Sequence, residues 1–162
     1  MPKKLTNERI RCVHFTWRVS RRGETWYADG RSNAINVGRH SLDTSRVILM
    51  GHSAGGQLAL WLASAPGVRV RAVVALAAVT DLAAFAAPSG CGAAVPRLMG
   101  GARDSSDELS IARYAVASPV TRAGAPPGTR VLLVSADDDR VVPRAQAEAY
   151  LARFRAAREL RV

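Results

Sequence analysis

From residue 46 onward, short runs of apolar residues alternate with segments that repeat their apolar positions at helical spacing. The runs 46–50, 72–77 and 130–135 are continuous and rich in Val, Ile and Leu or Ala, as expected for strands buried in a parallel sheet. Segments 57–65 and 143–162 contain strong helix formers with apolar residues on one face. They predict one helix after the first strand and another that continues to the C-terminus.

This order of elements predicts an α/β fold, a three-layer sandwich with a mostly parallel sheet. Residues 82–118 interrupt the alternation, and their high content of Ala, Gly and Pro predicts an irregular insertion. Helical fragments are expected within it, near residues 93–99 and 109–117. The α/β domain is therefore expected to span residues 41–162, as part of a larger fold.

Residues 1–40 have only weak periodicity and are expected to form an atypical basic segment. Residues 11–19 suggest a strand, 20–23 a turn and 25–27 a return strand. The segment holds nine basic and three acidic residues, so it accounts for most of the net charge of +10. An arginine-rich stretch can bind nucleic acid, but charge is the one feature that favours this. We expect a solvated basic surface and no nucleic-acid partner.

Composition narrows the classes of protein to which the chain can belong. Hydrophobic residues make up 48% of the chain, enough for a buried core. No apolar run is long enough for a membrane helix, and no signal peptide is visible, which predicts a cytoplasmic protein without membrane contact. Cys12 and Cys91 match no metal spacing and are expected to be free thiols. No metal or other cofactor is expected.

The sequence Gly51-His52-Ser53-Ala54-Gly55 matches G-x-S-x-G, and it lies between a predicted strand and a predicted helix. That context is typical of a nucleophile elbow, a sharp turn that exposes a serine. Small residues two positions either side are expected to let the two backbone segments cross closely. Ser53 is the predicted nucleophile, and the amide of Ala54 at the helix N-terminus is expected to stabilise an oxyanion.

A serine nucleophile needs a histidine base, and a carboxylate that orients the base. Asp137, Asp138 and Asp139 follow the third strand, where such a carboxylate is expected, and at least two of them must be solvated turn residues. A histidine is expected later in the chain, but none follows Asp139.

The histidines of this chain are His14, His40 and His52. His52 adjoins Ser53, so its side chain is expected to point away from the position of a base. His14 and His40 lie in or near the weakly patterned segment and are expected to be surface or structural residues.

Residues 45–59 resemble the nucleophile elbow of α/β-hydrolases, in the esterase/lipase and prolyl-oligopeptidase-like branch. Residues 117–120 resemble the segment before that branch's penultimate strand, and 131–143 its acid loop. In that pattern the catalytic acid stands four residues before a proline, which implies Asp139. The resemblance also implies an upstream oxyanion loop, which residues 1–40 do not show, and a histidine one strand further on. It implies a truncated hydrolase.

The hypothesis that follows is a serine hydrolase of small carboxylic esters, amides or short peptides, impaired by the missing histidine. Residues 82–118 would shape its pocket, with Phe85, Leu98 and Met99 as lining candidates. The alternative is a non-catalytic or degenerate hydrolase fragment that serves as an interaction domain. In either case exposed sheet edges predict self-association into a homodimer.

Overall fold

The computed structural model describes residues 15–22, 25–32 and 47–162. The chain divides into two compact units, Met1–Asp43 and Thr44–Val162. In the first, β1 (Phe15–Arg22) pairs with β2 (Thr25–Ser32) as an antiparallel hairpin. The predicted turn at 20–23 is wrong for residues 20–22, which continue β1, because each is paired with a residue of β2.

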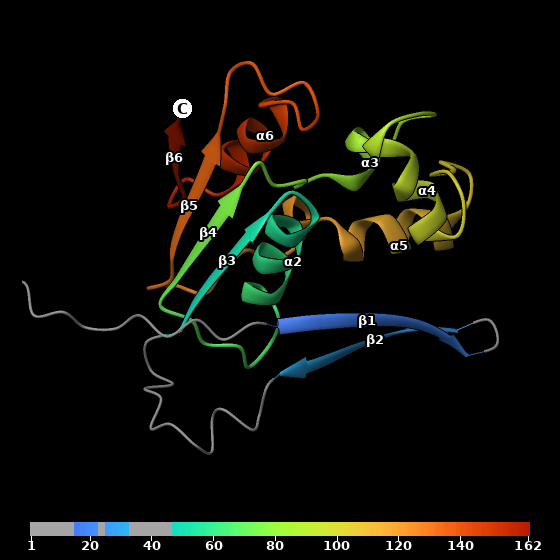
Figure 1. Cartoon of the computed structure of the whole chain (residues 1–162), viewed down its shortest axis with the longest axis horizontal. Helices are drawn as coiled ribbons and strands as arrows, with labels where there is room; N and C mark the ends of the chain where they lie inside the picture. The colour runs from blue at the N-terminus through green and yellow to red at the C-terminus, as the bar shows by residue number, and fades with distance from the viewer. Residues whose placement is uncertain (1–14, 23–24, 33–46) are drawn as a thin grey trace, which may run out of the picture. The chain divides into compact units, whose positions relative to one another are not determined.

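The second unit is built on a four-stranded parallel sheet with strand order β3-β4-β5-β6 (Figure 1). Its strands are β3 (Ile48–His52), β4 (Ala72–Leu76), β5 (Arg130–Ser135) and β6 (Arg158–Arg161). The predicted α/β class with a mostly parallel sheet is confirmed.

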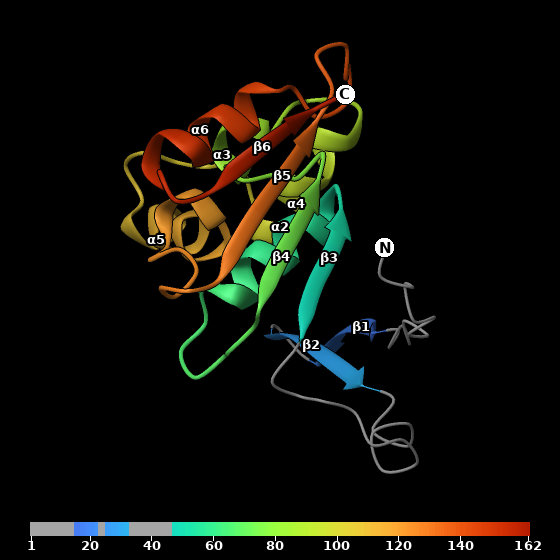
Figure 2. The same ribbon diagram turned by 90° about the vertical axis from the view of Figure 1, so that its left-hand side faces the viewer.

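Helices α2 (Ala54–Ala63) and α6 (Ala145–Arg153) lie on the same side of this sheet (Figure 2). Between them and the strands is the main core, which includes Leu60 of α2, Val73 of β4, Leu133 of β5 and Tyr150 of α6. These four side chains are almost completely inaccessible to solvent. Burial of their apolar surface therefore holds the helices against the sheet.

The insertion leaves the sheet at the carboxyl end of β4. It contains α3 (Leu82–Phe85), η2 (Cys91–Ala93), α4 (Ala94–Met99) and α5 (Glu108–Ala117), and η3 (Pro119–Thr121) follows it. A second apolar cluster holds these short helices together. The predicted helical fragments are found, within one residue at each end.

The predicted C-terminal helix is wrong beyond Arg153, because α6 ends there and the chain turns into β6. The ring of Phe154, the residue after α6, packs at a tilt against that of Tyr150, with centroids 4.5 Å apart. β6 has the sequence Arg-Glu-Leu-Arg, which has little intrinsic strand preference. Its hydrogen bonds to β5, and not its own sequence, make it a strand.

Gln146 of α6 joins this helix to the start of the insertion. Its side-chain oxygen accepts hydrogen bonds from the backbone amides of Thr80 and Asp81, at 2.9 and 2.7 Å. The hydroxyl of Thr80 donates to the Gln146 carbonyl. Gln146 and Thr80 are both buried, so water cannot replace these bonds.

We therefore expect Gln146→Leu to lower the free energy of unfolding by about 2–4 kcal/mol, because two buried amides lose their acceptor. Gln57→Leu is the matched control, since the Gln57 side chain makes one part-buried bond to the Ala117 carbonyl and should cost about 1 kcal/mol. Urea unfolding measures both. Equal losses in the two variants would contradict this role of Gln146.

Candidate active site

Ser53 occupies the turn between β3 and α2, and its backbone is strained there. Its φ of 55° and ψ of −120° lie in a region that non-glycine residues rarely occupy, at a cost of about 1–3 kcal/mol. The Ser53 amide donates to the Leu76 carbonyl of β4 at 2.8 Å, and the Gln57 amide donates to the Ser53 carbonyl at 3.1 Å. The serine is thus fixed between a strand end and a helix start.

Two glycines make this turn sterically allowed. A Cβ at Gly51 would lie 2.1 Å from the Gly55 carbonyl oxygen, and one at Gly56 would lie 2.7 Å from the Ala78 Cβ. A Cβ at Gly55 would meet nothing within 4 Å. The expectation of small residues two positions either side of Ser53 holds for Gly51 and is wrong for Gly55. At position 55 it is the backbone that comes close to Gly51.

Helix α2 carries the elbow and is tied to the far end of the insertion. The Gln57 amide group donates to the Ala117 carbonyl, and the Trp61 indole donates to the Val116 carbonyl, both at 2.8 Å. The guanidinium of Arg122 lies 4.6 Å from the centre of the Trp61 ring. These contacts satisfy two carbonyls at the C-terminus of α5, and they fix α2 relative to the insertion.

Ala54, the predicted oxyanion donor, is the first residue of α2. Amides in the first turn of a helix have no partner within the helix and lie at the positive end of its dipole. The amide of Ala54 therefore lies at the positive end of α2, in the residue that directly follows Ser53.

Asp139 lies after β5, and its carboxylate is held by the backbone. Its Oδ1 accepts from the amides of Val142 and Val141, at 3.0 and 2.8 Å. These two bonds lower the pKa of Asp139, with a smaller contribution from the charge of His52, while burial acts in the opposite direction. Among residues 47–162 no donor bonds to Oδ2. One oxygen of the Asp139 carboxylate is thus fixed by the backbone.

The two neighbouring aspartates have different surroundings. Asp137 forms a two-pronged ion pair with Arg161 at 2.7 Å and lies 3.6 Å from Arg144. The Arg161 guanidinium lowers the pKa of the Asp137 carboxyl. Asp138 is exposed. The Asp137 carboxylate is therefore paired with arginines. Of the three aspartates, Asp139 is the one whose carboxylate is held by backbone amides.

Of the three histidines, only His52 lies among the described residues. His52 is exposed and lies in register with Leu76 and, one strand further, with Val134. His14 and His40 lie outside the described residues. The sequence has no histidine between Ser53 and Val162.

An ion-pair network that the sequence did not reveal supports the acid loop. Arg144, the residue before α6, pairs with Glu159 of β6 at 3.1 Å, and the Ser135 hydroxyl donates to the same carboxylate. Bonds from Arg144 and then Ser135 lower the pKa of Glu159. Arg144 also reaches Asp137, so the network links the acid loop, α6 and β6. No local signal predicts it, because β6 itself was not predicted.

The described residues also bear on the expectations about metals, thiols and membrane helices. Residues that the structure describes contain no group of three or more candidate metal ligands. Cys91 is an exposed free thiol, and Cys12 lies outside the described residues. Among the described helices, none is long and apolar enough to cross a membrane.

A strained serine between a parallel strand and a helix, with a carboxylate after a later strand, is typical of the α/β-hydrolase fold. The family comparison gives the same class in more detail. Residues 21–160 match the model of the prolyl oligopeptidase family, so this chain belongs to that family. No curated protein sequence matches the chain.

Several solved structures share the fold. An acylaminoacyl peptidase of Pyrococcus horikoshii is 14% identical with a TM-score of 0.61, and the match covers 80% of this chain and 21% of that one. A puromycin-hydrolyzing peptidase of Mycobacterium tuberculosis is 24% identical with a TM-score of 0.57, and the match covers 80% and 20%.

A truncated carbohydrate esterase from gut microbiota is 18% identical with a TM-score of 0.56, over 80% of this chain and 55% of the esterase. The chain thus spans about a fifth of the peptidases and about half of the esterase. At these low sequence identities, the likeness shows a shared fold and nothing about activity.

The glycine contacts predict opposite effects of two similar substitutions. Gly51→Ala should cost about 3 kcal/mol or more of unfolding free energy, because its Cβ overlaps the Gly55 backbone. Gly55→Ala should be neutral or stabilise by about 0.5–1 kcal/mol, because alanine favours a helix and has space there. Urea unfolding of both variants tests the elbow, and a destabilised Gly55→Ala variant would contradict the open space beside Gly55.

The lowered pKa of Glu159 predicts a pH dependence of stability. A carboxyl with a depressed folded pKa stabilises the fold above its unfolded pKa of about 4.3, and loses this effect as pH falls through the folded value. Glu159→Gln should therefore lower the free energy of unfolding by about 1 kcal/mol at neutral pH. The loss should become progressively smaller below about pH 4. Urea midpoints across this range measure it, with Glu108→Gln as control. A constant difference would refute the ion-pair account.

Proposed function

We propose that the chain carries the nucleophile and acid of a serine hydrolase that acts on carboxylic esters, amides or short peptides. Ser53 attacks the carbonyl carbon and forms an acyl-enzyme, while the Ala54 amide donates to the oxyanion. Asp139 orients a histidine that removes the proton from Ser53. Membership of the prolyl oligopeptidase family supports this proposal.

The observation that carries the proposal is the strained backbone of Ser53. A strained backbone conformation costs about 1–3 kcal/mol per residue and persists only where the surrounding structure enforces it. Such strained residues cluster at active sites. Here Gly51 and Gly56 allow the crossing, and the Leu76 carbonyl fixes the serine amide. A structural Gly/Ser turn would not need this conformation.

The substrate class rests on the family and on the insertion. Phe85 and Met99 pack against the apolar cluster of the insertion, while Leu98 is 58% exposed. Of the three lining candidates, Leu98 is thus the side chain with most surface free to contact an acyl or leaving group. The structural neighbours include an acylaminoacyl peptidase, a puromycin-hydrolyzing peptidase and a carbohydrate esterase, which supports a carboxylic ester or amide as the substrate.

Catalysis by this chain is expected to be slow. Serine is a weak nucleophile without a base, and loss of one triad member typically lowers the rate by several orders of magnitude. Residues 53–162 contain no histidine. The alternative function is therefore a non-catalytic hydrolase domain that serves as an interaction module, and the absent histidine is the observation that favours it.

A fluorophosphonate probe separates these two functions. We expect slow formation of one adduct on Ser53, detected by intact mass, because the elbow and the Ala54 amide remain. Added imidazole should speed labelling by about tenfold or more, since it supplies the missing base and Asp139 orients it. Ser53→Ala should remove the adduct, and Asp139→Asn should reduce the acceleration by imidazole.

Asp138→Asn is the matched control, because Asp138 is the exposed neighbour of Asp139. It should leave the acceleration unchanged. A folded chain that gains no adduct even with imidazole would contradict hydrolase chemistry and favour the interaction domain.

A further inference from the structure

Val142 connects the acid loop, residues 136–144 between β5 and α6, to the insertion. Its backbone amide donates to Oδ1 of Asp139 at 3.0 Å. Its side chain is only 4% exposed and belongs to the apolar cluster that holds the short helices of the insertion together. The same residue thus contacts the carboxylate through its main chain and the insertion through its side chain.

Val141, the other residue that donates to this carboxylate, has no such anchor. Its amide lies 2.8 Å from Oδ1 of Asp139, but its side chain is 55% exposed. The bond from Val142 is also the largest of the effects that lower the pKa of Asp139. Because close packing fixes a buried side chain in place, the amide of Val142 is the donor whose position the core determines.

The side chains that surround Val142 in this cluster come from another part of the chain. The other buried members are Val79, Leu82 of α3, Val95 of α4 and Tyr114 of α5. The partly buried members also lie between residues 77 and 117. Val142 is therefore the contribution of the acid loop to a cluster that otherwise belongs to the insertion and the segment leading into it.

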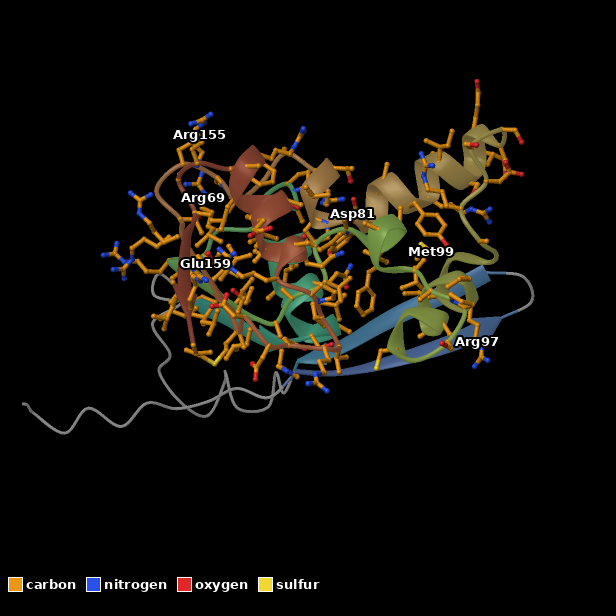
Figure 3. All side chains as sticks on the ribbon, turned by 90° about the horizontal axis from the view of Figure 1, so that it is seen from above. Arg69, Asp81, Arg97, Met99, Arg155 and Glu159 are labelled. Carbon is orange, nitrogen blue, oxygen red and sulfur yellow. The ribbon has the colours of Figure 1, made fainter. Side chains whose placement is uncertain are left out.

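A second contact joins the same two parts of the chain. The side-chain oxygen of Gln146, four residues after Val142, accepts from the amide of Asp81 at 2.7 Å. Figure 3 shows Asp81 between Glu159 of the sheet and Met99 of the insertion. The stretch that follows the acid is thus attached to the insertion by apolar packing and by buried hydrogen bonds.

We propose that Val142 is a positioning residue for Asp139. Its side chain anchors the acid loop in the cluster of the insertion, and its amide thereby fixes the carboxylate. The insertion then does more than shape a pocket, because its packing sets the direction of the carboxylate that orients the base. This role rests on the proposed function of Asp139, whereas the anchoring itself is independent of catalysis.

The substitution Val142→Ala in the full chain tests the anchoring. It removes both methyl groups of the valine from the cluster, so the amide of residue 142 should hold the carboxylate less firmly. The pKa of Asp139 should then rise toward its ordinary value, because bonds to the charged carboxylate are what lower it. A titration followed by carbon NMR of the carboxyl groups measures this shift, and Asp139→Asn identifies the signal.

Val95→Ala is the matched control. Val95 is buried in the same cluster, but the amides that hold Asp139 are those of residues 141 and 142. This variant should weaken the cluster and leave the pKa of Asp139 unchanged. His52, whose charge also acts on Asp139, is present in both variants.

Circular dichroism verifies that the variants fold. If Val142→Ala does not fold, Val142→Thr and Val95→Thr give the same comparison, because threonine keeps the shape of valine and places a hydroxyl in the cluster.

Labelling by the fluorophosphonate probe gives a second readout. Val142→Ala should lose most of the acceleration by imidazole, as expected for Asp139→Asn, because a misplaced carboxylate orients the base poorly. Val95→Ala should keep the acceleration.

Two results would overturn the proposal. An unchanged pKa of Asp139 in Val142→Ala would show that the side chain does not fix the carboxylate. An equal rise in Val95→Ala would show that the whole cluster, and not Val142, is responsible. A wild-type chain that is not labelled would contradict the proposed function instead, and the pKa comparison would still decide whether Val142 positions Asp139.

Discussion

The close crossing of β3 and α2 is the constraint on which the site depends. Gly51 comes so near the Gly55 backbone that no side chain fits at position 51, and this crossing forces Ser53 into its strained conformation. The same crossing fixes the start of α2, whose first residue is Ala54. Hydrogen bonds to Leu76 and Gln57 then fix the turn. Ser53 and Ala54 are therefore positioned by backbone geometry.

The loop that carries Asp139 is supported in a different way, by its own backbone amides and by side chains from distant segments. Two amides of its own loop orient the Asp139 carboxylate, while Arg144 and Arg161 hold Asp137 two residues earlier. Arg144 also pairs with Glu159 of β6. Formation of β6 thus contributes to the order of the acid loop, and the two halves of the site rest on one sheet.

Sequence patterns predicted the parts of this architecture that are local. The apolar run 130–135 became β5 without change, and G-x-S-x-G located the elbow, because both depend on neighbouring residues. β6 could not be predicted, since its residues Arg158–Arg161 gain their strand conformation from pairing with β5. The need for a glycine at position 56 could not be predicted either, because the residue that leaves no space for a side chain there, Ala78, is distant in sequence.

The central claim is that Ser53 remains a competent nucleophile although no base follows Asp139. An activated ester tests it directly, because its good leaving group needs little acid catalysis, whereas hydrolysis of the acyl-enzyme needs a base to activate water. Intact-mass measurement after exposure to a nitrophenyl ester should show one stable acyl group, located on Ser53. Absence of this adduct from the folded chain, or an adduct at another residue, would contradict the account.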